Sequence, residues 1–119
     1  MVSKIVRDNI INLQRIVQSS RKTARQILKH GSSSLIEALR QIIINFLAGV
    51  IQLKPTQLEE LKKYKAKLRK IRDKKTSKPQ RNKLIQSGGN FIIPLLTAVL
   101  PHIASGIASL IKRKQKNEQ

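Results

Sequence analysis

Apolar residues recur every three or four positions through the first part of the chain. Within residues 3–30 this spacing is carried by Ile5, Val6, Ile10, Leu13, Val17, Ala24, Ile27 and Leu28. That period is typical of amphipathic helix. Ser19 and Ser20 interrupt the pattern, either as a bend or as a new N-cap, and Gly31 stands where a helix commonly stops. Residues 3–30 are therefore predicted to be helical.

Residues 35–52 are predicted to form a second, more apolar helix. Its stripe of large side chains is wide: Leu35, Ile36, Leu39, Ile42, Ile43, Phe46, Leu47 and Val50. Ser34 and Glu37 have the spacing of a capping box at its start, and Pro55 disfavours continuation of the helix. An apolar face of this width needs cover, so we expect it to pack on the first helical region. The two together make a predicted helical subdomain, residues 1–54.

A strongly basic segment, residues 55–89, comes next. Thr56 with Glu59 makes a second capping box, and one long helix is predicted from there to Lys74. Its apolar side is formed by Leu58, Leu61, Tyr64 or Lys65, Leu68 and Ile71. Ser77 with Gln80 then starts a short helix over residues 78–86, which ends at a glycine pair.

The last segment, residues 90–119, is predicted to be an apolar helix with a basic terminus, and three interpretations of it are open. It is long enough to be a membrane anchor. Pro94 and Pro101 make a membrane-active interfacial helix the second interpretation. Burial against the face that includes Ile42 and Val50 is the third. The side chains expected to contact a membrane are Phe91, Ile92, Ile93, Leu95, Leu96, Val99, Leu100, Ile103, Ile107, Leu110 and Ile111. The predicted fold is thus all-α: a small helical subdomain, a long basic helix and a separable apolar C-terminal helix.

Charge adds the strongest indication of a partner. The 119 residues include 25 Lys and Arg but only 6 Asp and Glu, which gives a formal net charge of +19. Nucleic acid and anionic membrane are the polyanions that such a chain would bind. Aromatic residues make up only 3% of the chain, which argues against base stacking as the main binding mode. We expect the few carboxylates to be mostly ion-paired.

The basic segment is expected to contact phosphates rather than base edges. Lysine outnumbers arginine there, and no array of Asn or Gln is present for base readout. The expected contacts are Lys62, Lys63, Lys67, Arg69, Lys70, Arg72, Lys74, Lys75, Arg81 and Lys83. Double-stranded DNA is the expected partner, although this pattern does not distinguish it from RNA.

Catalytic and metal-binding patterns are missing from the sequence. His30 and His102 lie in different elements without a Ser/Asp or Cys context. Glu59 and Glu60 are explained by the helix dipole at a helix start. The chain has no cysteine, no phosphate-binding glycine loop and no metal-ligand spacing. An enzymatic function, a cofactor and a metal are therefore not expected.

Motifs in the basic segment resemble a small basic protein of Maverick/Polinton-type elements and adintovirus-like viruses. They are Leu53-x-Pro55-x-Gln57, Leu61-Lys62, Tyr64-Lys65, Leu68-Arg69, Asp73-Lys74-Lys75, Ser77 and Leu84-Ile85-Gln86-x-Gly88-Gly89. The similarity covers roughly residues 24–111. The glycine pair followed by an apolar Pro-Leu-Leu tail is also similar to the end of the adenovirus core protein X precursor, although Gln86 stands where that family has Met, Ile or Leu.

The resemblance implies a DNA-condensing protein of a virion core or host nucleus, cleaved by a viral cysteine protease at Gly88 and Gly89. The leading hypothesis is a virus-like or transposon-encoded protein that condenses DNA by sequence-independent phosphate neutralisation, with a tail that contacts membrane or a capsid protein. The alternative is a membrane-active or tail-anchored protein whose basic residues bind anionic lipid.

Overall fold

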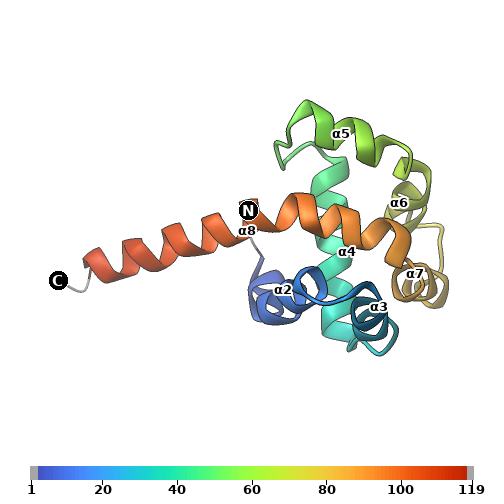
Figure 1. The fold of residues 1–119 in the computed structure, drawn as a ribbon, viewed down its shortest axis with the longest axis horizontal. Helices are drawn as coiled ribbons and strands as arrows, with labels where there is room; N and C mark the ends of the chain where they lie inside the picture. Colours follow the sequence, from blue (N-terminus) through green and yellow to red (C-terminus); the bar gives the residue numbers. More distant parts are fainter. Residues whose placement is uncertain (1–2, 118–119) are drawn as a thin grey trace.

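The computed structural model describes the backbone of residues 3–117 and the side chains of residues 3–103, and this part of the chain contains eight helices and no strand (Figure 1). The helices are α1 (Lys4–Asp8), α2 (Ile10–Gln18), α3 (Arg21–Lys29), α4 (Ser33–Leu47), α5 (Pro55–Lys62), α6 (Lys65–Arg72), α7 (Lys78–Gln86) and α8 (Gly89–Asn117). The predicted all-α class is confirmed.

Short polar side chains divide the first helical region into three helices. Ser20 caps α3 by accepting a hydrogen bond from the backbone N–H of Thr23 at 3.2 Å, as one of the two sequence interpretations expected. Asn9 separates α1 from α2 and is almost fully buried. Its Nδ2 donates to the Ile5 carbonyl and to Ser34 Oγ, both at 2.8 Å. The α1–α2 junction is therefore tied to the beginning of α4.

Helix α4 begins and ends earlier than the sequence pattern predicted. Its N-cap is Ser32, whose Oγ accepts a hydrogen bond from the Leu35 N–H at 3.1 Å. The Oγ of Ser34, the predicted cap, accepts a hydrogen bond from Asn9 Nδ2 instead. The helix stops at Leu47 instead of continuing to residue 52, because Gly49 adopts a φ of +74°. The Val50 N–H then donates to the Asn45 carbonyl at 3.1 Å, which closes the C-terminus as a Schellman motif does.

The prediction of one long basic helix is wrong. The chain turns at Lys63 and Tyr64 and forms α5 and α6, with Lys54 and Pro55, rather than Thr56, at the start of α5. The physical reason is that the two helices pack on different partners: α5 lies on α8, whereas α6 lies on α4 and α7. The Tyr64 ring fills the turn and packs on Phe91, with 6.4 Å between ring centroids.

One hydrophobic core joins the three segments that the sequence analysis separated. Helix α4 packs on α1, α6 and α7, while α8 packs on α2, α3, α5 and α7 (Figure 1). The buried side chains of this cluster are spread along the described part of the chain, from Val6 through Leu68 to Ile103. The apolar helix is therefore not separable over residues 91–103, because it covers the apolar faces of the other helices.

The side chains predicted to contact a membrane are mostly inside this core. Those that are buried are Phe91, Ile92, Leu95, Leu96, Val99, Leu100 and Ile103, and Ile93 is half-buried. Ile107, Leu110 and Ile111 lie outside the side chains that the structure describes. Within residues 3–103 no single helix is long and apolar enough to cross a bilayer; by length and composition alone, α7 and residues 89–103 would do so only as a pair bent by 77°.

Candidate nucleic-acid interface

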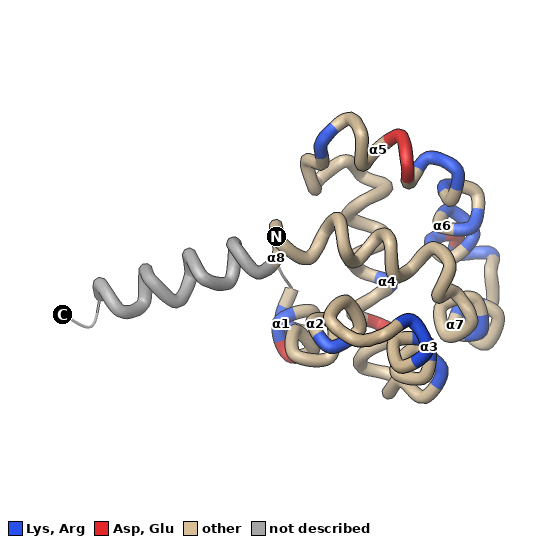
Figure 2. Tube along the Cα trace, in the orientation of Figure 1, with Lys and Arg blue, Asp and Glu red and all other residues tan. Residues whose placement is uncertain are grey.

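Helix α3 and the consecutive helices α6 and α7, which follow it much later in the sequence, form one strongly basic end of the molecule. Helix α7 packs on both α3 and α6, and Gln86 Nε2 donates to the Lys29 carbonyl at 3.1 Å. Lys and Arg gather over α3, α6 and α7, whereas residues 89–103 of α8 carry none (Figure 2). We call α3 together with residues 63–86 the basic end. It holds 15 of the 25 Lys and Arg of the chain and only one carboxylate, Asp73.

The ten residues predicted to contact phosphate lie at this end or beside it. All are exposed except Arg81, which is half-buried and whose Nε is buried without a hydrogen-bond partner among the described residues. Lys62 closes α5 and adjoins the basic end. The orientation follows from packing, because Leu61, Leu68 and Ile71 are buried and turn the opposite faces of their helices to solvent. The fold thus presents the predicted cations on the surface.

Two of these lysines lie over aromatic rings. Lys63 Nζ is 5.1 Å from the centroid of the Tyr64 ring, and Lys67 Nζ is 5.7 Å from that of Phe91. At these distances the ammonium groups are attracted to the ring faces, while the lysine stems cover apolar surface. These two cations therefore stabilise the α5–α6 turn in addition to contributing positive charge.

Internal ion pairs do not neutralise the basic end. The prediction that most carboxylates would be ion-paired is wrong for residues 3–103, where the single pair joins Arg40 Nη1 to Glu37 Oε1 at 3.0 Å. The Asp73 carboxylate makes a hydrogen bond to the backbone instead: its Oδ1 accepts from the Lys75 N–H at 3.0 Å. The positive charge at this end is consequently available to an external polyanion.

The cations of α3 are not among the residues predicted from sequence to contact phosphate. Arg21, Lys22, Arg25 and Lys29 belong to a nine-residue helix without an acidic residue, and that composition was the available signal. Only the packing of α3 on α7 brings these cations beside the others. Arg25 differs from the rest because its Nη2 donates to Asn90 Oδ1 at 2.9 Å, so it links α3 to the start of α8.

The glycine pair lies at a tight elbow between α7 and α8, whose axes differ by 77°. A Cβ on Gly88 would lie 2.6 Å from a ring carbon of Phe91 and 2.7 Å from the Leu84 carbonyl oxygen. A Cβ on Gly89 would lie 2.9 Å from Arg25 Cγ. Both glycines are buried, whereas proteases cut most readily at exposed, flexible loops. Cleavage here remains a prediction, and it requires the elbow to open first.

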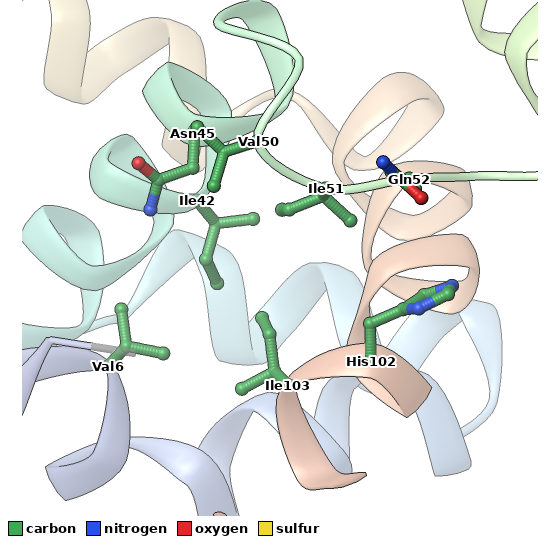
Figure 3. A pocket seen from close by; sticks show the side chains of 8 residues that line it. All are labelled: Val6, Ile42, Asn45, Val50, Ile51, Gln52, His102 and Ile103. Atoms are coloured by element: carbon green, nitrogen blue, oxygen red, sulfur yellow. The ribbon is translucent and has the colours of Figure 1, made fainter. Parts of the chain in front are cut away.

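The two histidines lie at different places: His30 directly follows the last lysine of α3 at the basic end, and His102 lies in α8. His30 is exposed at the C-terminus of α3. His102 borders a hollow of about 390 Å³ in which Ile42, Ile51 and Ile103 supply aliphatic walls (Figure 3). The other residues that line it are Val6, Asn45, Val50 and Gln52. Within the described part of the chain, no group of three or more His, Cys, Asp or Glu is arranged to hold a metal ion.

Comparison with protein-family models, with curated proteins and with solved structures found no match to this chain. Its function is therefore inferred from its residues and their geometry.

Proposed function

We propose that this protein binds and compacts double-stranded DNA by sequence-independent neutralisation of phosphates at the basic end. The observation that carries this proposal is the composition of the basic end. It holds 15 Lys and Arg and one carboxylate, and the described residues form no ion pair there. Such a surface repels itself until a polyanion covers it. The release of condensed counterions from DNA then provides a large driving force.

The chemistry of the exposed groups favours phosphate contacts over base readout. Lysine supplies a mobile point charge, and arginine supplies a planar fork that matches a phosphate. Neither reads a sequence unless it is aimed into a groove. The resemblance to small basic proteins of virus-like elements supports the same activity and extends the proposal to the core of a virion.

Binding to anionic lipid is the weaker alternative. A membrane-bound protein commonly places apolar side chains beside its cations. Here the apolar residues 91–103 are mostly buried. The large apolar side chains exposed within residues 3–103 are Ile11, Val50 and Leu58, which lie outside the basic end. This arrangement supports nucleic acid over lipid.

The test is a binding titration of the full chain with two duplex DNAs of unrelated sequence over a range of salt concentrations. We expect similar affinities for both duplexes and a loss of at least about 1000-fold between about 50 and about 200 mM salt, as for a protein with six or more phosphate contacts. Parallel arms use single-stranded RNA and vesicles containing phosphatidylserine. Affinity that is insensitive to salt, or tighter binding to the vesicles than to DNA, would overturn the proposal.

A further inference from the structure

The cations of the basic end are not spread evenly, because several of them surround a single hollow. The second half of α6 and the turn after it border a shallow hollow of about 680 Å³ that is open to solvent. We call this space the α6 groove; its lining residues are Ala66, Arg69, Lys70, Arg72, Asp73, Lys74 and Lys75. Five of these seven residues are cationic, and all seven are exposed to solvent.

Local sequence explains why these side chains meet. Ala66, Lys70 and Asp73 are separated by four and three residues, so they share one face of the helix, and alanine leaves space in its floor. At Asp73 the chain leaves the helix with φ −62° and ψ 126°. Two hydrogen bonds then fold it back: the Lys75 N–H donates to Asp73 Oδ1, and the Thr76 N–H to the Asp73 carbonyl at 3.1 Å. The turn thereby brings Lys74 and Lys75 to the hollow.

We propose that the α6 groove is a discrete phosphate-binding site, which holds one stretch of the sugar–phosphate backbone of the bound nucleic acid. The proposal rests on the proposed function and adds that binding is focused at one place on the basic end. A concave surface lined by charges of one sign concentrates the electrostatic potential. Arg69 and Arg72 can each donate two parallel hydrogen bonds to a phosphate.

Helix α3 provides the comparison within the same molecule. None of its four cations lines the α6 groove; Arg21 borders a different hollow together with Glu60, and Arg25 is already held by Asn90. Asp73 does not compete fully with a bound phosphate, because one of its carboxylate oxygens accepts the Lys75 N–H. The same net charge should therefore bind phosphate more tightly in the groove than along α3.

Two triple variants test this difference. The groove variant carries Arg69→Gln, Lys70→Gln and Lys74→Gln, and the matched control carries Arg21→Gln, Lys22→Gln and Lys29→Gln. All six positions are exposed, so each variant removes three charges without opening the core. We expect the DNA affinity of the groove variant to fall at least about tenfold further than that of the control at the same salt concentration. Equal losses would show a diffuse surface and overturn the proposal.

Inorganic tripolyphosphate provides a readout that does not depend on DNA or on a substituted chain. Added to the full-length protein, it should shift the backbone amide NMR signals of residues 66–76 more than those of α3. Equal shifts at both places would overturn the groove, even if the groove variant failed to fold. If the unmodified protein showed no salt-dependent binding to DNA, the proposed function would be wrong. The tripolyphosphate titration would still test separately whether the α6 groove binds phosphate.

Discussion

Single residues at the α7–α8 elbow set how closely two helices approach. Replacing Gly88 by alanine would place a methyl group against the Phe91 ring and the Leu84 carbonyl oxygen, and a backbone oxygen cannot move aside cheaply. We expect Gly88→Ala to lower the free energy of unfolding by about 1–3 kcal/mol. Gly89→Ala should cost less, since it meets the side chain of Arg25. Chemical denaturation of the two variants measures the order.

Asn82→Ala is the matched control for the elbow, because Asn82 lies on α7, is only half-buried and makes no hydrogen bond among the described residues. Its effect should stay within about 0.5 kcal/mol. If Gly88→Ala were as neutral as the control, the close packing at the elbow would not be the reason for glycine. A role in processing would then be the better explanation of the pair.

At the scale of elements, the α5–α6 turn depends on one aromatic side chain. Tyr64 packs on Phe91, and its hydroxyl makes no hydrogen bond within the described part of the chain. We expect Tyr64→Ala to destabilise the fold by about 1–3 kcal/mol, because the loss leaves a space beneath the turn. Tyr64→Phe keeps the ring and should change stability by less than about 0.5 kcal/mol. Thermal unfolding of both variants tests this, and equal midpoints would contradict it.

The elements that could be predicted from sequence are those with local determinants. Ser20 and Ser77 each cap a helix through their own neighbours, so the starts of α3 and α7 follow from a few residues. The break at Tyr64 could not be predicted, because α5 and α6 pack on different helices that are distant in the sequence, α8 and α4. The basic character of residues 62–83 could be predicted from the sequence, whereas the position of the α3 cations beside them required knowledge of the packing of α3 on α7.

At the scale of the whole molecule, the apolar helix and the basic end belong to one folded unit. A chain ending at Gly89 would lose buried side chains that include Phe91, Ile92 and Leu96. Losing one such side chain lowers the free energy of unfolding by about 2–5 kcal/mol. The loss of several therefore exceeds the whole free energy of unfolding of a typical domain, which is about 5–15 kcal/mol. We therefore expect residues 1–89 to show no cooperative unfolding transition by circular dichroism.

A chain ending at Ile103 is the matched truncation, because it keeps every buried side chain that the structure describes. It should unfold cooperatively and retain salt-dependent binding to DNA, since the whole basic end remains. Its affinity should fall only by the share of Lys112, Arg113, Lys114 and Lys116, which it lacks. A cooperatively folded 1–89 fragment would contradict the single core. Loss of DNA binding in a folded 1–103 fragment would instead move the main nucleic-acid contact away from the basic end and into the C-terminal residues.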